Sequence, residues 1–198
     1  MIIDYEKILN TNTDFYKNYY NFDNTHHFAQ ITGQHYKLLT YISHLFDGKT
    51  ILDVGTFDGG SCLALAQNKN NKVITYDVIN EHYKEITELK FLDDYKNVTR
   101  KIMDINDEDA TIINSADIIM LDIMYDGVTE QKFSDMLTNI GYKGYVFCDD
   151  VFSQRHPKCT EWFAKLNIEK YNLTEVGGHS GTGLLNYHED NSVIIKKD

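Results

Sequence analysis

Short apolar segments that alternate with amphipathic helical segments constrain this chain more than any other feature of its sequence. The clearest apolar segment is residues 116–122, which read Ala-Asp-Ile-Ile-Met-Leu-Asp. A nearly continuous apolar run of this length is typical of a strand buried on both faces of a parallel sheet. The residues after it recur at helical spacing, with Thr129 as a candidate cap and Gly141 as the end. The apolar run and the segment of helical spacing after it predict one strand followed by one helix.

The same alternation extends along most of the chain. We expect further strands at residues 49–55, 72–77, 97–103 and 144–148, and helices at 33–47, 60–67, 80–92, 106–115 and from about Pro157 to Leu166. Residues 168–176 and 183–196 alternate as strands do, with a glycine-rich turn between them. Repeated strand–helix units therefore predict an α/β protein with a doubly wound, mostly parallel sheet of seven strands and a C-terminal β-hairpin.

The length of 198 residues predicts one domain. Within it, we expect residues 1–32 to form an N-terminal helix and a possible lid, because residues 21–32 have the composition of a connecting loop. Residues 33–198 would form the α/β core.

Charge and cysteine content narrow the classes of function and of partner. The chain has 19 basic and 30 acidic residues, a net charge of −11, which predicts that it binds neither nucleic acid nor anionic membrane. The sequence shows no secretory leader and no stretch of about 18 apolar residues. The three cysteines, Cys62, Cys148 and Cys159, have no spacing typical of zinc sites or of disulfide frameworks. We therefore expect a cytoplasmic protein.

Acidic residues mark the end of every strand expected in the parallel part of the sheet. In such sheets, ligands bind at the carboxyl ends of the strands. The acids at these ends are Asp53, Asp77, Asp104, Asp122, Asp149 and Asp150. Part of the negative charge is thus expected to lie in one cleft, where it would attract cations.

A glycine turn follows the first of these strands. Residues 52–61 read Leu-Asp-Val-Gly-Thr-Phe-Asp-Gly-Gly-Ser, and the glycines allow the backbone to approach a ligand closely. The spacing of Gly55, Gly59 and Gly60, with Phe57 between them, departs from the dinucleotide fingerprint and disfavours a nicotinamide dehydrogenase. Asp77 ends the next strand, where a carboxylate can accept both ribose hydroxyls. A nucleoside without a pyrophosphate fits this arrangement better.

The stretch Ile-Leu-Asp-Val-Gly-Thr-Phe-Asp-Gly-Gly-Ser, followed by Ile-Thr-Tyr-Asp, resembles the first two motifs of class I S-adenosylmethionine-dependent methyltransferases. The resemblance covers roughly residues 30–198 and implies a Rossmann-like methyltransferase fold. It implies that the glycine turn holds the methionine end of the cofactor, that Asp77 binds the ribose and that Met103 and Asp104 contact adenine. The cofactor-binding residues implied are Asp53, Gly55, Thr56, Phe57, Gly59, Ser61, Asp77, Val78, Met103, Asp104 and Asp122. The alternative is that these acids only cap the helices that follow them.

A second group of acids stands at the ends of residues 116–122 and 144–148. Asp122, Asp149 and Asp150 would converge at neighbouring strand ends and repel one another unless a hard cation such as Mg²⁺ binds them. The pattern is similar to metal-dependent O-methyltransferases of the catechol and caffeoyl-coenzyme A type, and still more to the macrocin-type sugar O-methyltransferases. Carried over, this resemblance makes all three residues metal ligands. The alternative is that Asp149 or Asp150 caps a helix and that Asp122 contacts only the cofactor.

The residues at the positions of the general base differ from those of both families. Tyr125 stands where the catechol type has a catalytic lysine, and Met124 where the sugar enzymes have an acid. The candidates for the base are Asp126, His156, His179 and Tyr125, among which histidine has the most suitable ordinary pKa. For each of them, an ordinary structural role is the alternative.

These observations predict an S-adenosylmethionine-dependent O-methyltransferase, assisted by Mg²⁺ or another divalent cation. Its acceptor would be a small hydroxylated molecule, either a sugar or a phenolic compound, and a homodimer is a possible assembly. The alternatives are a metal-independent class I methyltransferase and a non-catalytic cofactor-binding or interaction module with the same fold.

Overall fold

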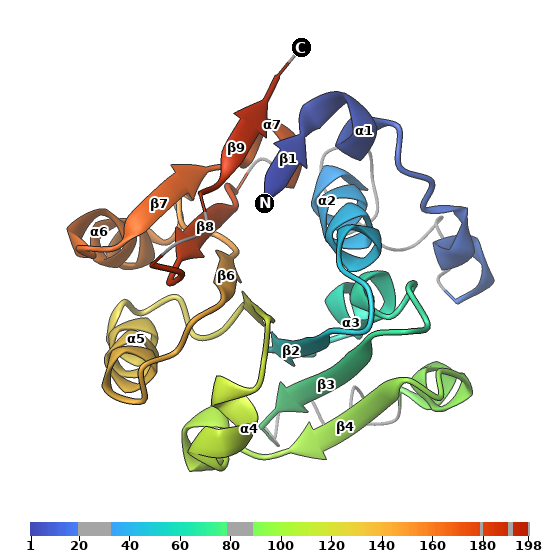
Figure 1. Cartoon of the computed structure of the whole chain (residues 1–198), viewed down its shortest axis with the longest axis horizontal. Coiled ribbons are helices and arrows are strands. Elements are labelled where there is room, and N and C mark those ends of the chain that lie inside the picture. The colour runs from blue at the N-terminus through green and yellow to red at the C-terminus, as the bar shows by residue number, and fades with distance from the viewer. Residues whose placement is uncertain (20–32, 79–88, 179, 190–191, 198) are drawn as a thin grey trace.

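A seven-stranded sheet forms the centre of the molecule (Figure 1). The computed structural model describes residues 1–19, 33–78, 89–178, 180–189 and 192–197. The strands lie in the order β4-β3-β2-β5-β6-β8-β7, where the first five are parallel to one another and β8 is antiparallel to both β6 and β7. Their bounds are β2 Thr50–Val54, β3 Lys72–Asp77, β4 Val98–Ile102, β5 Ile118–Leu121, β6 Tyr145–Cys148, β7 Glu169–Asn172 and β8 Gly183–Asn186.

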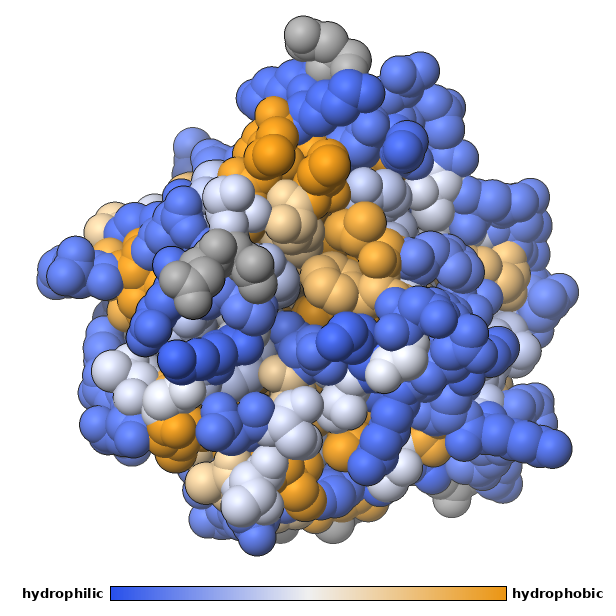
Figure 2. Space-filling view, viewed as in Figure 1, coloured by the Kyte–Doolittle hydropathy of each residue, from blue (hydrophilic) through white to orange (hydrophobic). Residues whose placement is uncertain are grey.

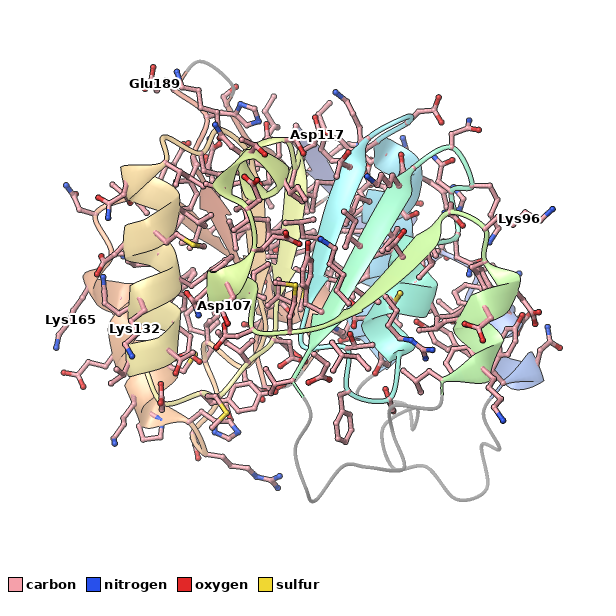
Figure 3. All side chains as sticks on the ribbon, turned by 90° about the horizontal axis from the view of Figure 1, so that it is seen from below. Lys96, Asp107, Asp117, Lys132, Lys165 and Glu189 are labelled. Carbon is pink, nitrogen blue, oxygen red and sulfur yellow. The ribbon has the colours of Figure 1, made fainter. Side chains whose placement is uncertain are left out.

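Helices cover both faces of this sheet. One layer contains α1 Tyr5–Leu9, α2 Gly33–Leu45, α3 Gly60–Leu65 and α7 Thr174–Gly177, and the other contains α4 Ala110–Asn114, α5 Val128–Asn139 and α6 Pro157–Lys165. Three short 3₁₀ helices are η1 Asp14–Asn18, η4 Lys90–Asp94 and η5 Ile105–Asp107. In the view of Figure 3, Lys132 of α5 and Lys165 of α6 point outward on the same side of the molecule. The expected doubly wound α/β fold is confirmed.

Strand β5 shows why its sequence is apolar throughout. Ile118 and Met120 pack into the core beneath α2 and α3, whereas Ile119 and Leu121 pack into the core beneath α5 and α6. All four side chains are at most 3% exposed. Because alternate side chains of a strand point to opposite faces, only a strand covered on both faces needs an apolar residue at every position.

The C-terminal hairpin exists, and it is shorter than expected. Strands β7 and β8 pair antiparallel with Tyr171 opposite Leu184, and their connection contains α7. The expected strand over residues 183–196 divides, because its last part forms a separate strand, β9 Ile194–Lys196. β9 pairs in parallel with β1, Ile2–Asp4, where we expected helix. Three residues are too few to show a period, and the partner lies at the other end of the chain.

Two of the expected helices differ in detail from those in the structure. The segment 106–115 divides into η5 and α4, since Asp109 caps α4 by accepting a hydrogen bond from the backbone N–H of Thr111. Thr129 was expected to cap α5 and instead lies inside it, because Asp126 accepts hydrogen bonds from the backbone N–H groups of Val128 and Thr129, both at 2.8 Å. The expected lid at residues 21–32 and most of the helix at 80–92 lie outside the described residues.

The surface in Figure 2 is largely hydrophilic, with apolar area gathered beside β1 and β9. Ile2 and Ile194 are neighbours in the register of these strands and are 50% and 55% exposed. Between them and the core lies Ile3, which is fully buried. Within the described ranges, no helix has both the length and the apolar character needed to cross a membrane.

Substitution of Ile3 tests whether the two-stranded sheet of β1 and β9 is part of the stable core. We expect Ile3→Ala to lower the free energy of unfolding by about 2 to 5 kcal/mol, because the alanine leaves a cavity where the buried side chain packed. Ile2→Ala, on the half-exposed face of the same strand, is the matched control and should cost less than about 1 kcal/mol. Urea denaturation measures both. Equally small losses of the free energy of unfolding in the two variants would show that β1 contributes little to the stability of the protein.

Candidate active site

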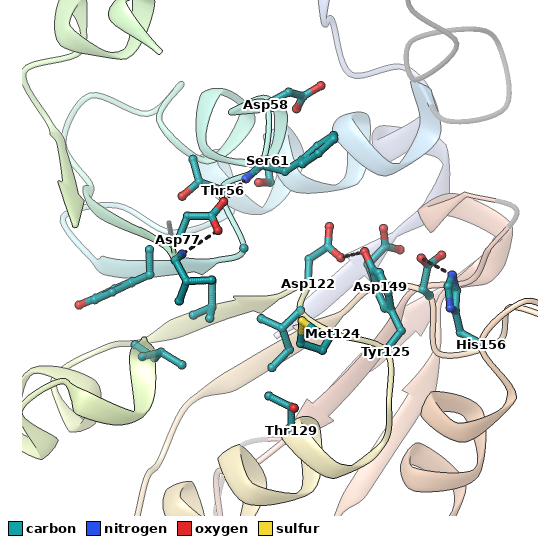
Figure 4. Close-up of a pocket in the computed structure, with 18 of the residues that line it drawn as sticks. Thr56, Asp58, Ser61, Asp77, Asp122, Met124, Tyr125, Thr129, Asp149 and His156 are labelled. Atoms are coloured by element: carbon teal, nitrogen blue, oxygen red, sulfur yellow. Dashed lines mark hydrogen bonds and ion pairs between the residues drawn. The ribbon is translucent and has the colours of Figure 1, made fainter. Parts of the chain in front are cut away.

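A cavity of about 1200 Å³ opens at the carboxyl ends of the parallel strands (Figure 4). The loops that follow β2, β3, β4, β5 and β6 all contribute to its wall. The predicted site residues on this wall are Gly55, Thr56, Phe57, Ser61, Asp77, Val78, Met103, Asp104, Asp122, Tyr125, Asp149, Asp150 and His156. Asp53, Gly59 and Asp126 lie off the wall, and His179 lies outside the described residues.

The glycine turn after β2 lies so close to β5 that a side chain could not fit. A Cβ atom built on Gly55, whose φ is +101°, would lie 1.7 Å from the carbonyl oxygen of Asp122. The turn is also tied to the end of β3, because the backbone N–H of Phe57 donates to Oδ2 of Asp77 at 2.7 Å. The turn and the β3 carboxylate are therefore one unit, facing the same part of the cavity.

Asp53 lies behind this turn and is fully buried. Its Oδ2 accepts a hydrogen bond from the Thr75 hydroxyl at 2.7 Å, whereas its Oδ1 has no hydrogen-bond partner among the described residues. Burial raises the pKa of Asp53 to about 6. Gly59, which the resemblance makes a cofactor-binding residue, lies off the cavity wall; it has a φ of +84° and precedes α3 as its N-cap residue, so in the structure it shapes the turn.

Met103 and Asp104 follow β4, which pairs with β3, and they line the cavity on the same side as Asp77. The carboxylate of Asp104 accepts a hydrogen bond from the backbone N–H of Asn106 at 2.9 Å and thereby caps η5. The alternative interpretation of the strand-end acids, as helix caps, thus applies to this residue, which also faces the cavity.

Three carboxylates from the ends of β5 and β6 each interact with a different partner on the protein. The Tyr125 hydroxyl donates a hydrogen bond to Asp122, Nδ1 of His35 lies 3.6 Å from Asp149, and Nε2 of His156 lies 3.6 Å from Asp150. The dashed lines in Figure 4 mark the first and third of these pairs. The rings of Tyr125 and His156 are in contact, with centroids 4.4 Å apart, so four side chains form one connected group, Asp122, Tyr125, His156 and Asp150, while Asp149 pairs with His35.

Burial and mutual repulsion set the protonation of these acids. Burial, followed by the charge of Asp149, raises the pKa of Asp122 to about 8. Burial, followed by the charge of Asp150, raises the pKa of Asp149 to about 7. Two neighbouring carboxyl groups can therefore hold protons near neutral pH, which relieves the repulsion that we expected a cation to relieve.

The expected magnesium site is not shown by these side chains as they are placed. Among the residues that the structure describes, no three or more His, Cys, Asp or Glu side chains are grouped so that they could hold a metal ion. Asp149 and Asp150 are adjacent in sequence, but Asp150 has a left-handed backbone, with φ of +58°, and its carboxylate pairs with His156. The three acids reach the same cavity and are divided among separate partners.

The candidates for the general base have different positions. Tyr125 and His156 lie on the cavity wall, beside Asp122 and Asp150. Asp126 is occupied as the cap of α5, and its hydrogen bonds to the backbone N–H of Thr129 and of Val128 help to hold its pKa below its ordinary value.

His35, which we did not predict as a site residue, lies on the wall from the first turn of α2. It is 8% exposed, and burial lowers its pKa. More than a hundred residues separate it from Asp149 in the sequence, and no local motif marks it.

The raised pKa of Asp122 predicts a dependence of stability on pH. Between the ordinary carboxyl pKa and about 8, the folded protein holds a proton that the unfolded chain has released, so the free energy of unfolding falls as the pH rises. We expect Asp122→Asn, which cannot ionise, to lessen this fall between about pH 5 and pH 8. Urea denaturation in metal-free buffer measures it. Asp126→Asn is the control, since the low pKa of Asp126 places its contribution to the pH dependence of stability at acid pH. If the free energy of unfolding of Asp122→Asn fell with pH as steeply as that of the wild-type protein, the raised pKa assigned to Asp122 would be contradicted.

Comparison with known proteins adds information on the fold. No protein-family model matches the sequence, and no curated protein matches it either. Several solved structures are similar to this one. The cofactor-bound protein Rv0187 from MTB has a TM-score of 0.60 and 14% identity, with 81% of this chain and 83% of that chain covered.

Two further similar structures are methyltransferases by description. A Staphylococcus aureus protein described as a caffeoyl-CoA O-methyltransferase has a TM-score of 0.59 and 18% identity, covering 87% of this chain and 96% of that chain. The SAH-bound methyltransferase PaMTH1 from Podospora anserina has a TM-score of 0.55 and 14% identity, covering 76% and 77%. The strand order, the glycine turn after β2 and these similarities identify the architecture of the chain as the Rossmann-like fold of class I S-adenosylmethionine-dependent methyltransferases.

Proposed function

We propose that this protein is an S-adenosylmethionine-dependent O-methyltransferase that acts on a small hydroxylated molecule, with residues 1–198 as one domain. The observation that carries the proposal is a single cavity in which the glycine turn after β2 lies between Asp77, at the end of β3, and the Asp122–Tyr125 pair after β5. The Asp77 side, the cofactor end, suits a nucleoside, and the Asp122 side offers a carboxylate that can accept a proton.

The cofactor end fits S-adenosylmethionine in shape and in charge. Gly55 leaves space where a side chain would stand, and the backbone of the turn is exposed to the cavity. Asp77 keeps a carboxylate at the strand end, where ribose hydroxyls can donate to it. When bound, the cofactor would supply a methyl group carried on a cationic sulfonium, which the surrounding carboxylates attract.

Asp122 is the proton acceptor that the geometry favours. It lies on the cavity wall, and its pKa of about 8 is close to the value at which a group both accepts and releases protons at neutral pH. The acceptor's oxygen would take the methyl group as the bond between that group and the sulfonium sulfur breaks, which would leave S-adenosylhomocysteine. The acceptor's O–H bond would also break, and its proton would pass to the Asp122 carboxylate. Tyr125 orients that carboxylate through its hydrogen bond, and the wall of the cavity holds the hydroxyl in line.

Magnesium-assisted transfer is the second candidate, favoured by the presence of three carboxylates at two neighbouring strand ends. The separate partners of these acids favour transfer without a metal ion, and a chelator distinguishes the two.

Cofactor binding is the first test of the proposal. We expect the protein to bind S-adenosylhomocysteine, and Asp77→Asn to weaken that binding about tenfold or more, because the ribose hydroxyls lose a charged acceptor. Isothermal titration calorimetry measures the affinity. The control is Asp107→Asn, which removes an exposed acid outside the cavity. Absence of binding to the wild-type protein at millimolar ligand would overturn the proposal.

The role of Asp122 is tested by turnover. With a panel of catechols and sugars as acceptors, we expect Asp122→Asn to lower kcat by about 100-fold or more while the affinity for S-adenosylhomocysteine changes little. We also expect turnover of the wild-type protein to persist in excess EDTA. Loss of turnover in EDTA with recovery on added Mg²⁺ would instead establish the metal-assisted mechanism. Cofactor binding without methylation of any acceptor would indicate a non-catalytic module.

A further inference from the structure

The cavity continues beyond the three carboxylates onto the loop that joins β6 to α6. Phe152, Ser153, Gln154, Arg155 and His156 all contribute to its wall there. Across the cavity, the loop after β5 contributes Met124, whose side chain is 68% exposed. This part of the cavity therefore combines apolar surface with a basic side chain.

Backbone hydrogen bonds hold this loop in one conformation. The N–H of Ser153 donates to the carbonyl oxygen of Asp150 at 3.2 Å, and the N–H of His156 donates to the carbonyl oxygen of Ser153 at 3.1 Å. The N–H of Arg155 donates to Oγ of Ser153 at 3.2 Å. The next side chain, His156, is held by Asp150 and by the ring of Tyr125. Arg155 thus projects from a loop whose backbone is positioned in advance, which lowers the entropic cost of using it for binding.

The charges on the wall single out Arg155. Among the described residues, the lysines and arginines that line the cavity are Arg100, Lys101 and Arg155. The first two have acidic partners, since Arg100 lies 3.7 Å from Asp93 and Lys101 pairs with Glu108. Arg155 has no acidic partner among the residues that the structure describes, although its chain is strongly acidic. Its guanidinium is therefore free to bind an oxyanion from solution.

The acids of the wall determine where a negatively charged group could lie. Asp150, together with Asp122 and Asp149 when these are ionised, would repel an anion at the end where the proton is accepted. Arg155 lies at the loop, and α6 begins two residues later at Pro157, so the positive end of that helix adds to its field. An anionic group is favoured at Arg155 and disfavoured beside the carboxylates.

We propose that Arg155 binds a carboxylate or phosphate group on the acceptor, so that the acceptor is a hydroxylated acid held with its anionic end at the β6–α6 loop and its hydroxyl at Asp122. The inference rests on the proposed function and adds the chemical class of the acceptor. A guanidinium binds both kinds of oxyanion through paired N–H donors, and a neutral acceptor would leave this side chain unused.

Matched ligand pairs test the proposal by calorimetry on protein saturated with S-adenosylhomocysteine. Protocatechuate against catechol tests a carboxylate, and glycerol phosphate against glycerol tests a phosphate. We expect the wild-type protein to bind the anionic member of at least one pair about tenfold more tightly or better, and Arg155→Gln to abolish that preference. The pair that shows the preference identifies the kind of oxyanion.

Control variants separate binding from general charge. Lys158→Gln removes one positive charge three residues away and off the cavity wall, so the preference should persist in it. Arg155→Lys should keep part of the preference, since the charge remains and the paired donors do not.

A wild-type protein without preference in either pair, or an equal loss in Arg155→Gln and Lys158→Gln, would overturn the inference. Failure to bind S-adenosylhomocysteine would instead overturn the proposed function. The ligand titrations are therefore repeated without it, where the anion preference is measured independently.

Discussion

The parallel pairing of β2 with β3 on one side and with β5 on the other is the constraint on which the site depends. Asp53 stands opposite Thr75 in one pairing and opposite Met120 in the other, so the three strands end at one level. The turn after β2 then meets the end of β5 directly, and Gly55 is the residue that permits this contact. If β2 shifted in register against its neighbours, the turn would lose its contacts with both Asp77 and Asp122. Both carboxylates are placed beside the turn by the pairing of β2 with β3 and with β5.

Much of the fold could be predicted from the sequence, because burial on two faces leaves a local signal. The apolar run of β5, the helical period of α2 and Pro157 at the start of α6 each specify an element without knowledge of its neighbours. The strand β1 could not be predicted, since its stability comes from β9 and not from its own three residues. Thr129 was the expected cap of α5, and only the structure shows that Gly127 is the N-cap residue and that the Asp126 carboxylate accepts the first backbone N–H groups of the helix.

The candidate site, like the fold, could be predicted from the sequence only in part. Position along the strands was enough to predict that Asp77, Asp104, Asp122, Asp149 and Asp150 face one cavity. It was not enough to predict how the last three are used, because that depends on side-chain direction and on partners such as Tyr125 and His35. The sequence argument treated repulsion among acids as a need for a cation. Protons and nearby hydrogen-bond donors are a second way to relieve the same repulsion, and burial together with the neighbouring acids raises the pKa of Asp122 and of Asp149.

The pairing of β1 with β9 sets an order on folding. Ile2 must pair with Ile194, so the chain has to be synthesised at least as far as Ile194 before β1 can find its partner. The central sheet connects segments much closer in sequence and can form earlier, since shorter loops cost less entropy to close. Until β9 has been made, the buried position of Ile3 is unfilled, and the apolar segment that contains it is exposed. One part of the core is thus completed by a strand that is synthesised long before its partner and stays unpaired in between.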